Sequence, residues 1–231
     1  MTGIKPTLYH FWSDTCSQRL RLAFGYKNII YDDRPLSYCD DETFFELGVA
    51  RKVPILKMPD STLLTDVNDL LWNIDNLFPE GDALVHGVID ESAWKALLEW
   101  RDKADAILSR MLAPALLNYI DIAENEDSVD AYKRQVQDKY QMSAEALAND
   151  RYAAYEQFAK MTNIKALGQH LSKNKFYMGK PSIADVLIAA DIYPLQCLDG
   201  VSLPIDILYY LARVEKVCDV DLQQGFKVKL N

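Results

Sequence analysis

A short stretch near the N-terminus carries residue types suited to chemistry on sulfur. Asp14-Thr15-Cys16-Ser17, directly after Ser13, combines one thiol with nearby hydroxyls. Apolar periodicity from Cys16 onward predicts a helix, and the free backbone N–H groups at a helix N-terminus stabilise a nearby thiolate. Cys16 is therefore a candidate nucleophile, and Ser13, Thr15 and Ser17 are candidate hydrogen-bond donors. The alternative is that Cys16 is a small buried residue without a chemical role.

A second stretch, residues 51–70, predicts a strand that begins at a proline, a hairpin and a helix start. Pro54 cannot donate to a ladder, so it suits the start or edge of the strand Val53–Leu56. A trans or a cis Val53–Pro54 bond is compatible with the sequence. Turn residues follow at 58–61, and Asp66 then offers an oxygen to the N-terminus of an apolar-periodic segment. Asp66 is therefore a candidate helix cap.

Composition excludes several classes of function. The 231 residues are 49% hydrophobic and 26% charged, as in ordinary globular proteins, and the formal net charge is −9. That charge disfavours a phosphate-binding face, so we expect no nucleic-acid partner. No apolar run approaches the ~20 residues that span a bilayer, and the N-terminus lacks the apolar region of a secretory signal. We therefore expect a cytoplasmic protein that does not bind membranes.

The cysteines and histidines are too scattered to form a metal site. The cysteines form no C-x-x-C pair, and in a reducing compartment we expect them all to be free thiols. Metal sites need clustered donors, so we expect no metal. The cysteines are Cys16, Cys39, Cys197 and Cys218, and the histidines are His10, His86 and His170.

The elements that must position these residues fall into two groups. Before Pro79 the pattern predicts strand, helix, strand, helix, two hairpin strands and helix; the second strand is expected at 29–31 and the second helix at 41–47. Residues 1–79 are thus predicted to form an α/β domain, with a linker over 80–91. Arg19 and Arg21 are expected on a solvated face of the first helix.

Residues 92–231 are predicted to form an all-helical domain. Pro114 should kink or close the first long helix, the acidic stretch 124–127 is expected to be a loop or frayed end, and a second long helix should run from 147 towards 171. Ser182 and Asp185 have capping-box spacing before a helix that is apolar nearly all round, which predicts a buried helix. Trp94 and Trp100 on the first helix are compatible with a homodimer.

Together these motifs resemble the glutathione transferase superfamily, and in particular its branch of bacterial glutaredoxins with the glutathione transferase fold. The resemblance rests on the Val-Pro hairpin ending in Asp66, on Ser182-Ile183-Ala184-Asp185, and on residues 24–28 and 200–222. It implies an α/β thioredoxin-like domain that binds glutathione, followed by an all-α domain. In the family the proline is cis, and the residue before it, here Val53, pairs backbone to backbone with the cysteinyl unit of glutathione.

The sequence departs from this pattern in two places. Asp14 and Ser17 stand where the glutaredoxins have Cys-Pro-x-Cys, and Asp14 also stands where the zeta-class transferases have a catalytic serine. A carboxylate cannot exchange disulfides, so we expect no dithiol activity. Val67 replaces the serine that follows the acidic residue in the family. Asp66 can still receive the γ-glutamyl ammonium, but a lost charge-assisted hydrogen bond costs about 1.5–3 kcal/mol, or roughly ten- to a hundredfold in affinity.

Three functions stay open on the sequence. The first is a glutathione transferase with Val53, Pro54, Asp66 and Val67 at the glutathione site, which transfers glutathione to a small electrophile. The second is a monothiol glutaredoxin that forms a mixed disulfide through Cys16. The third is a non-catalytic scaffold or regulator with the same fold.

Overall fold

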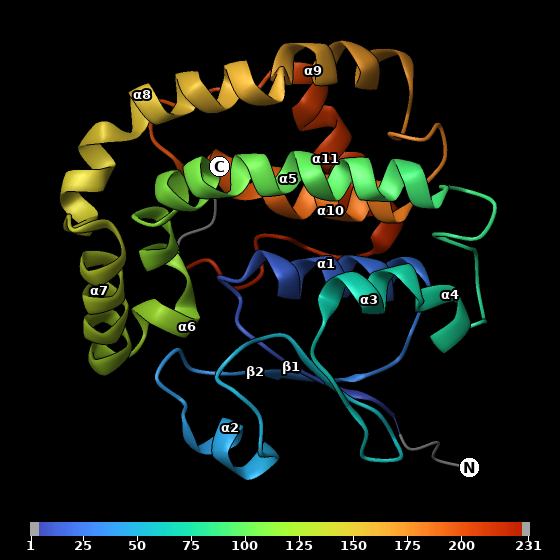
Figure 1. The fold of residues 1–231 in the computed structure, drawn as a ribbon, viewed down its shortest axis with the longest axis horizontal. Coiled ribbons are helices and arrows are strands. Elements are labelled where there is room, and N and C mark those ends of the chain that lie inside the picture. Colours follow the sequence, from blue (N-terminus) through green and yellow to red (C-terminus); the bar gives the residue numbers. More distant parts are fainter. Residues whose placement is uncertain (1–4, 228–231) are drawn as a thin grey trace.

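The chain forms a small mixed sheet flanked by helices, followed by a region built only of helices (Figure 1). The computed structural model describes residues 5–227, apart from the side chain of Arg151. The first group of elements is β1 (Thr7–His10), α1 (Thr15–Tyr26), β2 (Asp32–Pro35), α2 (Glu42–Leu47), β3 (Ile55–Lys57), β4 (Leu63–Leu64), α3 (Val67–Trp72) and α4 (Ile74–Leu77). The second is α5 (Glu91–Leu112), η1 (Ala115–Asn118), α6 (Ile120–Ala123), α7 (Glu126–Tyr140), α8 (Ala144–Thr162), α9 (Ile164–Lys173), α10 (Ile183–Ile192), η2 (Tyr193–Cys197) and α11 (Ile205–Cys218).

The sheet has the strand order β2-β1-β3-β4. β1 pairs parallel with β2 and antiparallel with β3, which pairs antiparallel with β4. Because of these directions, the end of β1, the start of β3 and the end of β4 all lie at one end of the sheet. The predicted fold class, an α/β N-terminal part and an all-α C-terminal part, is confirmed. The predicted boundaries at 79 and 91 stay a prediction.

Helix α1 lies between the sheet and the helical region, and α2 lies on the opposite side of the sheet (Figure 1). The apolar side chains of α1 are buried, and α1 packs against α10 and α11. All ten residues of α10 are buried, as its composition predicted, and the Ser182–Asp185 capping box is present. Helices α1 and α10 therefore form the contact between the sheet-containing part and the C-terminal region.

Arg19 and Arg21 do not form a solvated face, so that prediction is wrong. Their exposed fractions are 1% and 4%. Arg19 Nη2 donates to Asp191 Oδ1 of α10 at 2.6 Å, and the guanidinium of Arg21 lies 4.4 Å from the centroid of the Trp12 ring. Arg21 Nη2 also donates to Gln224 Oε1 at 2.5 Å, so each buried guanidinium is bonded to a residue from a distant part of the chain.

The second strand also differs from the prediction at 29–31. Asn28 adopts a left-handed conformation (φ 55°), and Ile29 N–H donates to the carbonyl of Phe24, which completes the end of α1. Ile30 is 71% exposed. The strand that pairs with β1 is instead the exposed edge strand β2, where polar residues are ordinary because one side faces water.

Two helical predictions are corrected in the C-terminal region. The acidic stretch at 124–127 begins α7, where Asn125 caps the helix and Glu126 and Asp127 lie in the first turn, a position that favours negative charge. The long helix expected over 147–171 is two helices, because Asn163 adopts a left-handed conformation between α8 and α9. As predicted, α5 ends just before Pro114. Within residues 5–227, no helix is long and apolar enough to cross a membrane.

Gly25 sets how closely α1 approaches α11. A Cβ at this position would lie 1.9 Å from the carbonyl oxygen of Cys218, a backbone atom that cannot rotate away. By contrast, a Cβ at the helical Gly168 would lie 3.3 Å from the Cβ of Pro204. Only glycine at position 25 permits this helix packing.

We expect Gly25→Ala to destabilise the protein by about 1–3 kcal/mol, because the clash outweighs the higher helix propensity of alanine. Urea unfolding followed by circular dichroism measures this change. Gly168→Ala is the matched control and should alter the free energy of unfolding by less than about 1 kcal/mol. Equal effects of the two substitutions would contradict the close approach at Gly25.

Candidate functional site

The loop between β1 and α1 is held by Asp14, which caps the helix. The carboxylate Oδ2 of Asp14 accepts from the backbone N–H of Ser17 at 2.6 Å and from its hydroxyl at 2.7 Å. Burial raises the pKa of Asp14, although these bonds act in the opposite direction. Ser17 is fully buried and its hydroxyl donates to Asp14. Of the predicted donors, Ser17 is therefore engaged inside the protein.

Ser13 is also engaged, with a residue that the sequence did not suggest. Its hydroxyl donates to Asp121 Oδ2 at 2.6 Å, and its backbone N–H donates to the same oxygen at 3.3 Å. Asp121 belongs to α6, so this contact ties the loop to the helical region. Burial raises the pKa of Asp121 to about 6.

Of the two interpretations of Cys16, its surroundings favour the structural cysteine over the stabilised thiolate. Burial, and then the nearby charge of Asp14, raise the pKa of the Cys16 thiol to about 11. The helix N-terminus cannot compensate for desolvation there, because Asp14 already occupies the capping position. At neutral pH Cys16 is a protonated thiol, and its environment resembles that of a structural cysteine.

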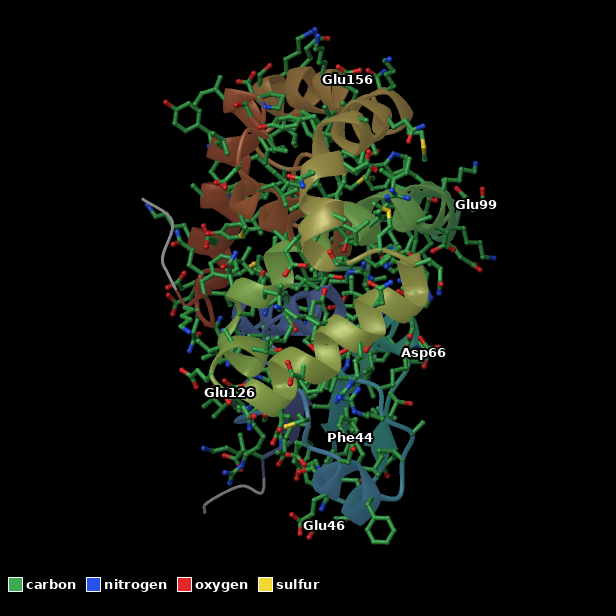
Figure 2. All side chains as sticks on the ribbon, turned by 90° about the vertical axis from the view of Figure 1, so that its left-hand side faces the viewer. Phe44, Glu46, Asp66, Glu99, Glu126 and Glu156 are labelled. Atoms are coloured by element: carbon green, nitrogen blue, oxygen red, sulfur yellow. The ribbon has the colours of Figure 1, made fainter. Side chains whose placement is uncertain are left out.

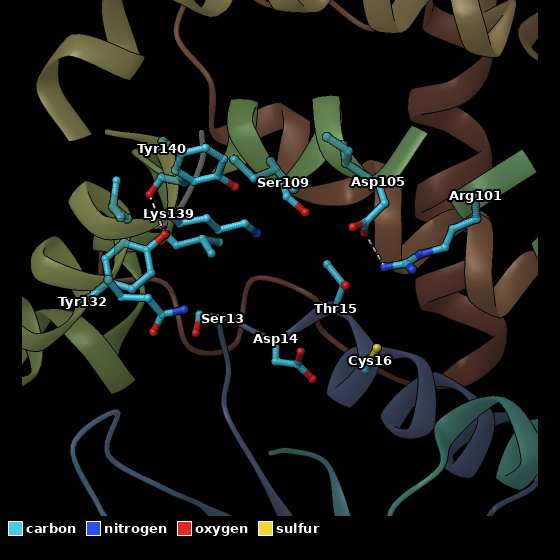
Figure 3. A pocket seen from close by; sticks show the side chains of 16 residues that line it. Ser13, Asp14, Thr15, Cys16, Arg101, Asp105, Ser109, Tyr132, Lys139 and Tyr140 are labelled. Carbon is cyan, nitrogen blue, oxygen red and sulfur yellow. Dashed lines mark hydrogen bonds and ion pairs between the residues drawn. The ribbon is translucent and has the colours of Figure 1, made fainter. Parts of the chain in front are cut away.

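Thr15 is the predicted donor whose hydroxyl stays available. It is half-buried, and within residues 5–227 its hydroxyl has no hydrogen-bond partner. Figure 3 shows this hydroxyl pointing into a cavity, while the carboxylate of Asp14 turns away from the helices α5 and α7. Thr15 is therefore the side chain of the loop that can act on a molecule in this cavity.

The cavity lies between the loop and the helices α5 and α7, with a volume of about 250 Å³ (Figure 3). One side is apolar, formed by Leu108, Leu112 and Val136, and Tyr132 closes one end with its hydroxyl donated to the carbonyl of Ala113 at 2.8 Å. The size is below the ~300–1,000 Å³ of pockets for drug-sized ligands. It suits a small, partly apolar molecule.

The Val53–Pro54 segment lies at the same end of the sheet as the loop. The bond is cis, and the pairing of Tyr9 with Ile55 places Val53 opposite Phe11. Val53 is buried, yet within residues 5–227 neither its amide N–H nor its carbonyl makes a hydrogen bond. Buried backbone groups are nearly always paired. A free donor and acceptor on one residue suit an extended peptide that pairs with it.

Asp66 and Val67 complete this end of the sheet, because they follow β4. Asp66 is exposed (Figure 2), and its Oδ1 accepts from the backbone N–H groups of Asn68 and Asp69 at 3.0 Å each. The carboxylate thus caps α3, and its other oxygen makes no bond within the described residues. Val67, half-buried, is the first residue of α3. The capping and ligand interpretations of Asp66 are compatible with each other.

The sequence did not predict an ionic network at the wall of the cavity. Arg101 of α5 pairs with Asp105 at 2.7 Å and lies 3.7 Å from Asp191, the partner of Arg19. The signal was present, since Asp191 is a charged residue near the end of a largely apolar helix whose other aspartate, Asp185, forms the capping box, and a buried charge needs a partner. In the described part of the chain, no His, Cys, Asp and Glu side chains are grouped to hold a metal.

Comparisons with known proteins bear on the fold. No protein-family model matches the chain. Glutaredoxin 2 of Escherichia coli K12 is 25% identical over 212 residues, which span 91% of this chain and 94% of that protein. A probable maleylacetoacetate isomerase 2 of Drosophila melanogaster is 33% identical over 74 residues, so the match covers only 32% of that protein.

Solved structures agree along nearly the whole chain. Glutaredoxin 2 of Salmonella typhimurium, solved in complex with glutathione, has a TM-score of 0.71 at 20% identity and covers 96% of this chain and 99% of its own. A glutathione S-transferase of Ceriporiopsis subvermispora, also with glutathione, has a TM-score of 0.71 at 15% identity, covering 93% and 96%. The chain has the glutathione transferase fold. The resemblance predicted from the sequence is thereby confirmed, and within this fold the loop, Val53 and Asp66 meet at one end of the thioredoxin-like sheet.

The buried carboxyl of Asp121 predicts a pH dependence of stability. Its pKa is about 6 in the folded protein against an ordinary value of 3.8, so the folded protein binds this proton more tightly than the unfolded chain. The contribution to stability is therefore largest below the ordinary value and is lost as pH rises through the folded value, by about 3 kcal/mol in total. Urea unfolding of the wild type and of Asp121→Asn across this range should give curves that diverge as pH rises; parallel curves would refute the raised pKa.

Proposed function

We propose that the protein binds glutathione and transfers it to a small electrophile. The observation that carries this proposal is the backbone of Val53, whose N–H and carbonyl are free of hydrogen bonds in the described part of the chain and match those of an extended peptide. The cysteinyl unit of glutathione would pair with Val53, and the ammonium of its γ-glutamyl unit would meet the free oxygen of Asp66. Two solved proteins with this fold hold glutathione, which supports the same assignment.

The sulfur of such a glutathione would lie near Thr15, because Val53 and the β1–α1 loop share one end of the sheet. A free thiol has a pKa of about 8.5, so at neutral pH most of it is protonated. Donation from the Thr15 hydroxyl favours the thiolate. With a chloronitrobenzene, sulfur forms a bond to the ring carbon, the carbon–chlorine bond breaks, chloride leaves, and the thiol proton passes to solvent.

The other two functions are distinguished by particular residues. A monothiol reductase would need Cys16 as a thiolate, and the pKa of about 11 for that thiol opposes it. A non-catalytic scaffold is favoured by Val67, which lacks the hydroxyl that the family uses at this position. The location in the cytoplasm, which we expect from the sequence alone, is also a proposal.

Binding is tested by titrating glutathione into the protein in a calorimeter. Asp66→Asn should weaken binding roughly tenfold while leaving stability unchanged, because asparagine caps a helix as well as aspartate but carries no charge. Val67→Ser should tighten binding, since it adds a hydroxyl at the start of α3. Absence of any heat with wild-type protein at millimolar glutathione would favour the scaffold and overturn this proposal.

Catalysis is tested at Thr15 with 1-chloro-2,4-dinitrobenzene. Thr15→Ala should lower kcat/KM about a hundredfold, as loss of a donor to a developing or stabilised anion does elsewhere. Thr15→Ser keeps the hydroxyl and should stay within about threefold of wild type. Cys16→Ser should conjugate normally; a loss of activity confined to Cys16→Ser, with Thr15→Ala active, would instead identify the thiol chemistry.

A further inference from the structure

The charged groups around the cavity are not equally engaged. Arg101 Nη2 pairs with Asp105 at 2.7 Å, and Oδ2 of Asp14 accepts both Ser17 bonds. These groups therefore satisfy one another inside the protein. Lys139 of α7 is the exception among the charged residues that line the cavity.

The ammonium of Lys139 has no anionic partner. Within the described residues no carboxylate lies within ion-pair distance of it, and its nearest recorded contact is the ring of Tyr140, whose centroid is 5.1 Å from Nζ. Figure 3 shows the side chain extending from α7 into the cavity. Lys133, on the same helix, pairs with Glu145 at 3.4 Å. Lys139 is exposed, and of the basic side chains that line this cavity it is the one without an ion-pair partner in the described part of the chain.

The surroundings of Lys139 indicate what kind of molecule it would bind. Leu108, Leu112 and Val136 give the cavity an apolar side, while the ammonium supplies a positive charge near one end. A cavity of about 250 Å³ holds a small ring with a short substituent. An apolar body with one carboxylate would satisfy both the apolar wall and the ammonium.

We propose that the electrophile is a small apolar molecule that bears a carboxylate, and that Lys139 selects it by binding this group. The inference rests on the proposed function, since it names the class of second substrate for the same site. The carboxylate would lie against Lys139 on the α7 side, and the reacting carbon would point towards Thr15 and the sulfur. The transfer itself is unchanged: a carbon–sulfur bond forms, the leaving group departs with its electron pair, and the thiol proton goes to solvent.

Two arenes that differ in charge at one substituent test this proposal. 4-Chloro-3-nitrobenzoate and 4-chloro-3-nitrobenzamide have nearly the same shape and the same leaving group, so their kcat/KM ratio reports recognition of the carboxylate. Lys139→Gln should lower this ratio by about three- to tenfold, and salt should lower it in the wild type but not in the variant. Lys133→Gln is the matched control on α7 and should leave the ratio within about twofold of wild type.

A second measurement separates this inference from the proposed function. Binding of the unreactive 3-nitrobenzoate, measured by calorimetry without glutathione, should weaken in Lys139→Gln by a similar factor. If the wild type conjugates neither arene, the transfer proposal fails, and the calorimetric comparison alone then decides whether Lys139 binds the carboxylate. An unchanged kcat/KM ratio in Lys139→Gln, or unchanged 3-nitrobenzoate affinity, overturns the role of Lys139.

Discussion

The ion pair between Arg19 and Asp191 is the constraint on which the rest of the structure depends. It joins α1, which carries the loop, to α10, the buried helix of the C-terminal region, and both side chains are almost fully buried. Removing one partner of such a pair typically costs about 3–5 kcal/mol, because the other charge is left unpaired, whereas replacing both with apolar residues can be neutral. Its value is therefore geometric, since it fixes the α1 N-terminus relative to the α5 wall, where Arg101 extends the same network to the cavity.

With α1 fixed in this way, most polar side chains of the loop between β1 and α1 are engaged in structural contacts. The carboxylate of Asp14 accepts the hydrogen bonds of the helix cap and of the Ser17 hydroxyl, and the carboxylate of Asp121 accepts from Ser13. Burial desolvates the Cys16 thiol. Each of these contacts removes a group that could have acted on a ligand. What they leave exposed to the cavity is one hydroxyl, that of Thr15, on a backbone with little freedom to move. Such a site stabilises the sulfur of a bound molecule better than it supplies a sulfur of its own.

Local patterns, together with the resemblance to the glutathione transferase superfamily, were enough to predict the fold, but not which side chains of the site are available. The buried α10 and its capping box follow from periodicity and capping residues that act over a few positions. The partners of Arg19 and Ser13 lie 172 and 108 residues away, so no local pattern could reveal them. The misplaced strand at 29–31 has a related origin. β-Branched residues favour a strand, but the backbone N–H of Ile29 donates to the carbonyl of Phe24 and so completes the end of α1. Asp121 gave no sequence signal at all, whereas Asp191, a charged residue that takes no part in capping the largely apolar helix α10, did.

The two sides of the cavity differ in whether their charged side chains are paired. On the α1 and α5 side of the cavity, Arg19 and Arg101 pair with Asp191 and Asp105, so these charges offset one another and exert little net field on a ligand. On the α7 side of the cavity, the ammonium of Lys139 has no counter-charge in the described part of the chain. Without a bound anion, only solvent screens its field. Displacing that solvent with an apolar body strengthens the attraction for the anion it carries, since the local dielectric falls. The apolar wall and the unpaired lysine therefore reinforce each other, and neither alone would discriminate between neutral and anionic molecules of the same shape.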